Sequence, residues 1–230
     1  MKINIFNNLT EKEKTDAVEG LIKNSTPHQD FFMMVIFSIL MATFGLLLDS
    51  PAVVIGSMLI APILYPILSL SLGIVMSDQK LITRALFTIL KSAGLGIAAA
   101  VIITLFLSDQ GSELTSEIIA RTYPSLLYIA VAVIAGLAVS FALIKPQLNE
   151  TLPGIAVSVA IIPPLAVIGI GIAKLNWAVI SGSFLLLLIN ILGIIFASMI
   201  IFSLMNLYVK KKVAQEVAKK EDKKLEQNNA

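Results

Sequence analysis

Apolar residues in this chain gather in long runs instead of recurring at the spacing of a half-buried helix or strand. Six runs of about 18 or more mostly apolar residues are separated by short polar segments. About 20 such residues cross the roughly 30 Å core of a bilayer, and a soluble domain could not bury six of these runs. The pattern predicts six transmembrane spans: Phe31–Leu48, Ala52–Met76, Ala85–Leu107, Pro124–Ile144, Leu152–Ala173 and Trp177 to about Tyr208.

Spans of this length are expected to be helices, because a bilayer offers no partner to an unpaired backbone group. The chain is therefore predicted to be an all-α polytopic membrane protein with three parts. Residues 1–30 form an N-terminal segment, residues 31–205 the membrane domain and residues 206–230 a basic helical tail. The last apolar run exceeds one crossing, so we expect it to leave the membrane as a continuous helix that frays into disorder.

The N-terminal segment carries the pattern of a short surface helix. Thr10 and Glu13 have the spacing of a capping box. One apolar edge follows, and it is only two turns long, so we expect this helix to dock on the membrane domain instead of lying in the lipid surface. The edge consists of Ala17, Val18, Leu21 and Ile22.

The distribution of charge predicts the orientation. Of the 17 Lys and Arg residues, 14 fall on the side of both termini, Arg121 and Lys174 fall on the other, and Lys91 lies within a span. Basic residues accumulate on the cytoplasmic side of membrane proteins. The sequence thus predicts a multi-pass protein of the cell membrane with both termini in the cytoplasm. The run Lys210–Lys212 is expected to lie against anionic lipid headgroups.

The segments that begin near Asp49 and Glu150 resemble each other at an offset of 101–102 residues. Each places an acid and a hydroxyl residue before a proline and a second proline farther along the span. Each half of the chain, about 31–107 and 124–205, holds three spans, an odd number, so the sequence predicts a 3+3 inverted repeat as found in secondary transporters. The alternative is that apolar segments resemble each other by composition alone. The matched pairs are Asp49 with Glu150, Ser57 with Ser158, Pro51 with Pro153 and Pro62 with Pro164.

Prolines within the second and fifth spans predict interrupted helices. Pro62 and Pro66 lie about one turn apart, and Pro163 and Pro164 are adjacent. A proline inside a helix removes one donor and leaves the carbonyl four residues earlier without its bond. The spans are either kinked for packing, or broken so that half-helix ends face a shared site. Hydroxyls close to the prolines, such as Ser57 and Ser158, are candidates to bond the freed groups.

Two further polar residues lie deep within spans. Lys91 is a functional candidate because intramembrane charges are costly, yet it lies close enough to the cytoplasmic end to snorkel. Asn190 occupies roughly the equivalent position in the second half, at an offset of 99, and such a residue often bonds a neighbouring helix. Small residues at four-residue spacing in spans 3 and 4, such as Gly96 and Gly136, predict close packing or a seam between copies of a homo-oligomer.

Composition narrows the class of function. The chain is 57% hydrophobic and contains no Cys and one His. A soluble enzyme, a disulfide scaffold, a Cys-based metal site and a nucleic-acid binder are excluded. An intramembrane enzyme lacks its parts, since no span carries His or a carboxylate. We therefore predict no catalytic residue, no metal and no cofactor.

The glycine–proline segments and the span-6 Asn resemble an uncharacterised bacterial and archaeal family, the domain of unknown function 389. The resemblance covers about residues 31–205 and is carried by SPAVVIGSMLIAPILYPILSLSLGIVMSD (50–78), LITRAL (81–86), SLLYIAVAVIAGLA (125–138), LPGIAVSVAIIPPLAVIGIGIA (152–173) and LLLLINILGIIFAS (185–198). It implies a polytopic membrane domain and supplies no activity. Its hallmarks are Gly56, Pro62, Pro66, Pro153, Gly154, Pro163, Pro164 and Asn190.

Two functions fit these observations. The first is a transporter or channel for a small solute or ion, with a site between spans 2 and 5 and a slight preference for an anion. Half-helix N-termini carry partial positive charge, and no span holds a carboxylate for a cation. The second is a scaffold, assembly factor or lipid-binding module without a water-accessible cavity. Candidate site residues are Ser57, Pro62, Pro66, Ser158, Pro163, Pro164, Lys91 and Asn190.

Overall fold

The computed structural model describes residues 9–108, 113–145, 148 and 161–228, and regular structure in these ranges is entirely helical. Four helices, α2, α5, α7 and α10, are long and apolar enough to cross a membrane, and a fifth crossing results if the bent pair α3 and α4 is one span. The helices are α1 (Glu11–Asn24), α2 (Gln29–Leu47), α3 (Pro51–Ile60), α4 (Leu64–Val75), α5 (Gln79–Leu107), α6 (Ser116–Ile119), α7 (Leu126–Ile144), α9 (Ile162–Ala173), α10 (Trp177–Leu204), the 3₁₀ turn η2 (Leu207–Lys210) and α11 (Lys211–Asn228).

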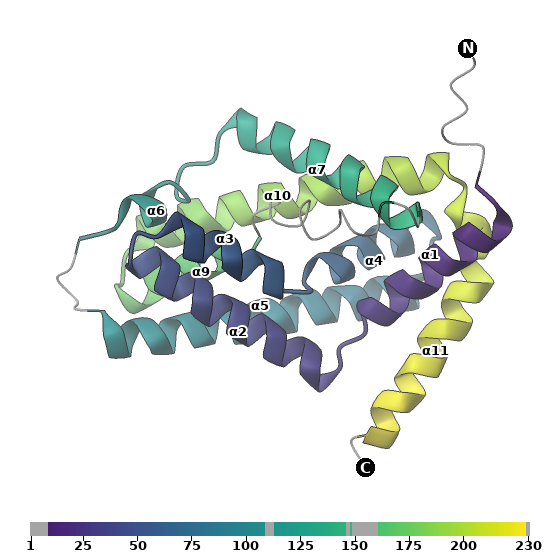
Figure 1. Ribbon diagram of the computed structural model, residues 1–230, viewed down its shortest axis with the longest axis horizontal. Helices are drawn as coiled ribbons and strands as arrows, with labels where there is room; N and C mark the ends of the chain where they lie inside the picture. Colours follow the sequence, from purple (N-terminus) through teal and green to yellow (C-terminus); the bar gives the residue numbers. More distant parts are fainter. Residues whose placement is uncertain (1–8, 109–112, 146–147, 149–160, 229–230) are drawn as a thin grey trace.

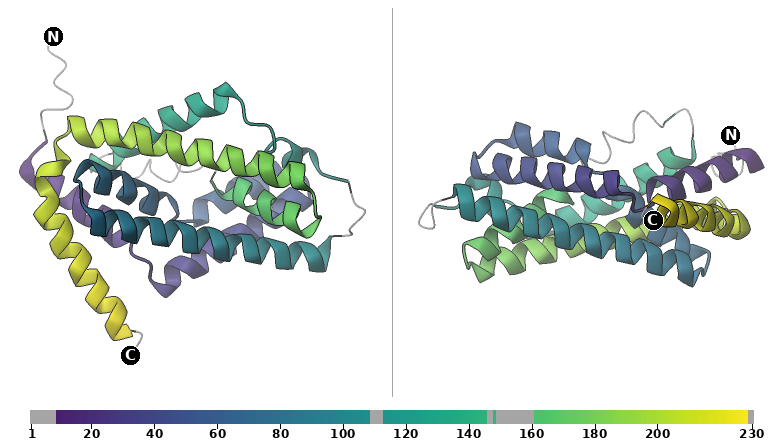
Figure 2. Two further views of the ribbon diagram at one scale, coloured as in Figure 1. Left: turned by 180° about the vertical axis from the view of Figure 1, so that it is seen from behind. Right: turned by 90° about the horizontal axis from the view of Figure 1, so that it is seen from below.

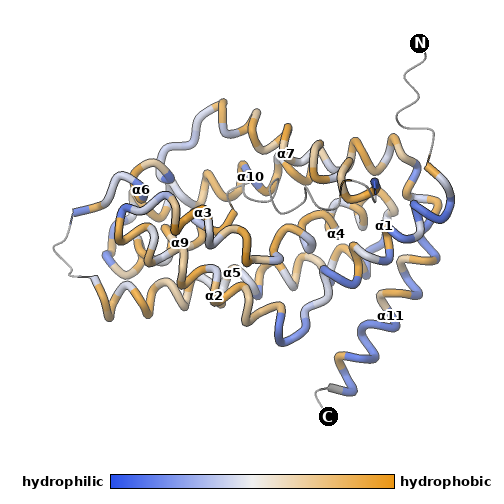
Figure 3. Tube along the Cα trace, in the orientation of Figure 1, coloured by the Kyte–Doolittle hydropathy of each residue, from blue (hydrophilic) through white to orange (hydrophobic). Residues whose placement is uncertain are grey.

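The long helices run along one axis of the bundle, with α9 and α4 among them (Figures 1 and 2). Helix α9 packs against α2, α5 and α10, whereas α4 packs against α5 and α10. Helices α1 and α11 lie together at one end, and α6 lies at the other. Apolar residues follow the bundle and polar residues gather at its ends and along α11 (Figure 3). This banding is typical of a multi-pass membrane protein.

Three corners between helices share one backbone geometry, a Schellman motif that runs directly into the next helix. In each, one residue adopts a left-handed φ, and the N–H of the residue after it bonds to the carbonyl of a glycine five positions earlier. The glycine has no room for a side chain, because an added Cβ would lie 2.8–3.0 Å from an aliphatic atom of the next helix. The corners comprise Gly45, Asp49 and Ser50 (N···O 2.8 Å), Gly73, Ser77 and Asp78 (2.9 Å), and Gly171, Leu175 and Asn176 (2.8 Å).

Some helix boundaries in the structure differ from those of the predicted spans. Helix α5 begins six residues before Ala85, because the Asp78 carboxylate accepts from the N–H of Leu81 and caps the helix earlier. The expectation that the last span continues into water as one helix is wrong. Helix α10 ends at Leu204, Asn206 adopts a left-handed φ of 56°, and α11 starts anew at Lys211.

The terminal helices are docked against the bundle. The capping box of Thr10 and Glu13 is confirmed, and all four residues of the apolar edge of α1 are buried. This edge packs on α4, α7 and α11. The expectation of a solvated tail is wrong for the start of α11, because Gln215 donates to Asp78 at 2.7 Å and Lys211 to the Ser77 carbonyl at 2.9 Å. Lys210, expected against lipid, pairs with Glu11 at 2.9 Å.

Candidate functional site

The second predicted span is broken in the middle of the bundle. Helix α3 ends at Ile60, α4 begins at Leu64, and the two are bent by 53°. The end of a helix leaves its last four carbonyls without intrahelical partners, and Pro62, which follows, has no N–H to offer. A bent pair of helices, with Pro62 between them, thus takes the place of the second predicted span.

A serine from another helix bonds one of the freed carbonyls. The hydroxyl of Ser38 on α2 donates to the Ser57 carbonyl at 2.6 Å, and both side chains are fully buried. The Ser57 hydroxyl instead turns back to the Val54 carbonyl of its own helix, also at 2.6 Å. Sequence reasoning missed Ser38, although it is one of two hydroxyl residues, with Thr43, in the apolar run Phe31–Leu48. The bond shows that polar backbone at this depth is compensated by the protein, as apolar surroundings require.

The fifth predicted span is described only from residue 161 onward. Pro163 and Pro164 lie in the first turn of α9, where a missing N–H costs no helical bond. Both are buried among α2, α5 and α10, and α9 also touches α3. The structure thus packs α9, which begins with these prolines, against the helix that ends before Pro62. Ser158, with Pro153 and Gly154, lies outside the described residues.

Two hairpins of the structure correspond at an offset of 98 residues. Helices α4 and α9 each have 12 residues with a proline in third place, and each ends in a glycine corner before a long helix. The long helices α5 and α10 have 29 and 28 residues. In this register Pro164 corresponds to Pro66, whereas the sequence offset of 102 paired it with Pro62. The stretch from Pro164 to its corner is one helical turn shorter than the stretch from Pro62 to its corner.

The same register changes which residue of the first hairpin is equivalent to Asn190. At offset 98 it corresponds to Ser92, and one residue turns a helix by 100°. Both residues lie near the middle of their helices and are buried, and the Ser92 hydroxyl has no hydrogen-bond partner in the described part of the chain. Asn190 is engaged by a neighbouring group. These two positions bring polar side chains into the buried interior near the middle of α5 and α10.

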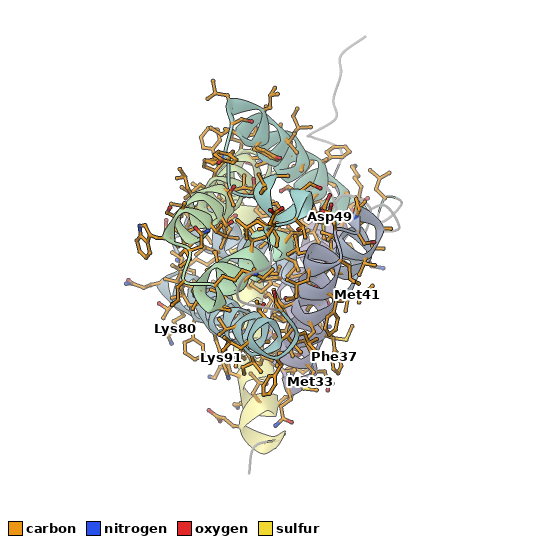
Figure 4. The ribbon with its side chains drawn as sticks, turned by 90° about the vertical axis from the view of Figure 1, so that its left-hand side faces the viewer. Met33, Phe37, Met41, Asp49, Lys80 and Lys91 are labelled. Atoms are coloured by element: carbon orange, nitrogen blue, oxygen red, sulfur yellow. The ribbon has the colours of Figure 1, made fainter. Side chains whose placement is uncertain are left out.

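Lys91 faces out of this interior, about 100° around α5 from the buried Ser92. Its side chain is exposed, and its Nζ lies 4.3 Å from the ring centroid of Phe32 on α2, a cation–π contact. Figure 4 shows Lys91 at the outer surface of the bundle, on the same side as Lys80. The structure therefore does not bring Lys91 together with Ser57 or Asn190.

The small residues of spans 3 and 4 pack within the chain. An added Cβ on Gly96 would lie 3.0 Å from Ile39, and one on Gly136 would lie 2.8 Å from Ala197. At the end of the second stripe the Ser140 hydroxyl donates to Ser198 at 2.7 Å. The stripes thus form intramolecular seams, and neither is free to join two copies.

Carboxylates at the bundle ends serve as helix caps. Hydrogen bonds from the Glu117 N–H and the Ser116 hydroxyl lower the pKa of Asp49, which links the α2–α3 corner to α6. Burial raises the pKa of Asp78, but bonds from Leu81 and Gln215 and the charge of Lys211 outweigh it and lower the pKa overall. Among the described residues, no cluster of three His, Cys, Asp or Glu could hold a metal ion.

The apolar helices and the break at mid-bundle define a helical protein of the multi-pass membrane type. Within that class the chain belongs to the family described as "Domain of unknown function (DUF389)", whose model matches residues 58–196. The chain is 28% identical over 204 residues to "Uncharacterized protein MJ0678" of Methanocaldococcus jannaschii, an alignment that covers 85% of this chain and 63% of that protein. The chain thus spans less than two thirds of that relative's length. No solved structure matches it significantly.

Proposed function

We propose that this protein is a transporter or channel for a small solute or ion, with its site between the α3–α4 break and the first turn of α9. The observation that carries the proposal is the break itself. It exposes helix ends at the depth of the apolar core, and there such ends are tolerated only inside protein or beside a cavity. Transporters place broken helices of this kind at their substrate sites.

The correspondence of the two hairpins supports an inverted repeat of three plus three spans, with halves at about 31–107 and 124–205. The corner at Gly73 lies at the end with α1 and α11, and the corner at Gly171 lies at the end with α6 (Figure 1). Helix α5 packs on α9 as α10 packs on α4, and α2 packs on α5 as α7 packs on α10. Equivalent hairpins that start from opposite ends are the expected geometry of alternating access.

We propose that both termini face the cytoplasm and that the protein is a multi-pass protein of the cell membrane. Helices α1 and α11 share one end of the bundle (Figure 1), and together with η2 they hold ten of the 17 basic residues. Arg121 and Lys174 lie towards the other end, which holds α6 and the start of α10. This asymmetry follows the positive-inside rule.

The geometry shifts the expected cargo away from an anion. Pro66, Pro163 and Pro164 occupy the first turns of the two half-helices and carry no N–H, so these turns have fewer donors for an anion. Lys91 lies on the outer surface and would snorkel to the headgroups. The end of α3 contributes carbonyl oxygens. The site is therefore better suited to a small cation or to a solute that donates hydrogen bonds, and the proposal includes no catalytic residue, cofactor or nucleic acid.

The absence of Cys from the sequence permits a direct test of the site. Ala61→Cys at the break and Ser92→Cys at the unpartnered hydroxyl are expected to react with a small membrane-impermeant thiol reagent in intact vesicles. Ser140→Cys is the matched control for Ser92→Cys, since both serines are fully buried but Ser140 lies between α7 and α10. Protection of Ala61→Cys and Ser92→Cys by one solute from a panel of ions and small metabolites would then identify the cargo.

The same experiment decides against the scaffold alternative. A scaffold with prolines for packing alone has no water path to the break. If Ala61→Cys and Ser92→Cys react no faster than Ser140→Cys, the transport proposal is refuted and the non-transporting module is favoured. Flux of the protective solute into liposomes that contain the purified protein provides the functional confirmation.

A further inference from the structure

A groove separates α11 from the start of α5 at the end of the bundle that holds both terminal helices. Its volume is ≈ 660 Å³, and it is lined by the α4–α5 corner, the first turns of α5 and one face of α11. Its lining is rich in charge, with more basic than acidic side chains. The basic residues are Lys80, Arg84, Lys211, Lys219 and Lys223, and the acidic ones are Asp78, Asp222 and Glu226.

Two of the three carboxylates are already engaged within the protein. Asp78 accepts from the Leu81 N–H at 3.1 Å and from Gln215 at 2.7 Å. Asp222 pairs with Arg84 at 3.2 Å. By contrast, the exposed lysines on both walls have no ion pair in the described part of the chain. These lysines, Lys80 on α5 and Lys219 and Lys223 on α11, leave the groove with uncompensated positive charge.

Besides the exposed lysines, Arg84 supplies a guanidinium group that is held in place by the protein. Its side chain is 14% exposed, and its terminal nitrogens are held by Thr26 at 2.9 Å and by the Ala218 carbonyl at 3.4 Å, besides Asp222. Its Nε is buried and lacks a hydrogen-bond partner among the described residues.

We propose that this groove binds a phosphate-bearing anion. A phosphate offers several acceptor oxygens, which suit an immobilised guanidinium and lysines from two walls. The groove lies at the start of α5, where the span is predicted to enter the headgroup layer, so the phosphate can come from an anionic lipid or from a soluble phosphate compound. This site is independent of the proposed transport site at mid-bundle.

The test compares a groove variant with a charge-matched control. Lys80→Gln combined with Lys223→Gln removes two unpaired lysines from opposite walls. Lys212→Gln combined with Lys220→Gln removes the same charge from exposed positions of α11 that do not line the groove. The full-length protein in neutral detergent is titrated with inorganic pyrophosphate, with short-chain phosphatidylglycerol and with short-chain phosphatidylcholine, and the shift in thermal unfolding is followed.

The groove variant is expected to weaken binding of the anionic probe about 25-fold, at about fivefold for each lysine, and the control about twofold or less. Phosphatidylglycerol binding without pyrophosphate binding identifies a lipid headgroup as the ligand, and pyrophosphate binding identifies a soluble phosphate compound. Either result supports the proposal if phosphatidylcholine is inert. The proposal is overturned if neither anion binds, or if the two variants lose affinity equally, because the effect would then be one of net charge.

Discussion

The hydrogen bond from Ser38 to the Ser57 carbonyl predicts a specific loss of stability. Ser38→Ala removes the donor and leaves a fully buried carbonyl oxygen at the end of α3 without that partner. An unsatisfied buried acceptor costs about 1–3 kcal/mol in soluble proteins, whereas hydrogen bonds between membrane helices average about 0.6 and reach about 1.7 kcal/mol. We expect a loss of about 1–1.5 kcal/mol, near the upper end of the membrane range, because the carbonyl lies in the last turn of a helix that is broken in the apolar core.

Ser71→Ala provides the matched control. Ser71 is also fully buried, but its hydroxyl bonds the Ile67 carbonyl of its own helix, which the backbone already satisfies. Its loss is expected to cost less than about 0.5 kcal/mol. Unfolding in mixed micelles of increasing SDS content, assayed by pulse proteolysis, measures both variants. Equal losses for the two variants would refute the reasoning, because the cost would then follow from removing a buried hydroxyl and not from the break.

Three further predictions concern other contacts. Gly169→Ala should destabilise the bundle by about 2 kcal/mol or more in the same assay, since the new Cβ would lie 2.5 Å from the Cβ of Ala100. An unchanged midpoint of unfolding would contradict the packing of α9 on α5. Leu175→Gly should stabilise the protein by about 1 kcal/mol, because an exposed leucine adopts a φ of 51° there, and a lower midpoint would argue against that strain. The pKa of Asp78 is lowered on folding, so its contribution to stability is complete above its unfolded pKa, near 3.8, and is lost as the pH falls through its folded pKa. The stability of Asp78→Asn, measured from pH 6 to 3, should therefore fall less steeply than that of the unchanged protein. Parallel curves would refute this prediction.

The sequence was most informative where a single residue type determines the local structure. Long apolar runs located the four helices that are long enough to cross a membrane, and the spacing of Thr10 and Glu13 located the start of α1. The prolines match at an offset of 102, whereas the corners at Gly73 and Gly171 share their backbone geometry at an offset of 98. Ser77 and Leu175 share a left-handed φ at equivalent positions but share no side-chain chemistry.

Other features depend on contacts between distant residues and leave no local pattern. The docking of α11 rests on bonds such as Gln215 to Asp78, across 137 positions. Ser38 bonds the Ser57 carbonyl only because packing places the last turn of α3 beside α2. Lys91 faces outward because the neighbouring residue Ser92 packs into the interior. If α5 were packed one residue out of register, Lys91 would take the inward position of Ser92.

The three glycine corners have a consequence for how the chain assembles. Each is closed by residues that lie nine positions apart, such as Gly45 and Val54, so its loop-closure entropy is small. Helices α2 with α3, α4 with α5, and α9 with α10 can therefore form as hairpins as soon as their own residues have entered the bilayer. The break between α3 and α4 is then the junction between two of these pairs, and long-range contacts such as those of α9 with α2 and α5 form between preformed pairs.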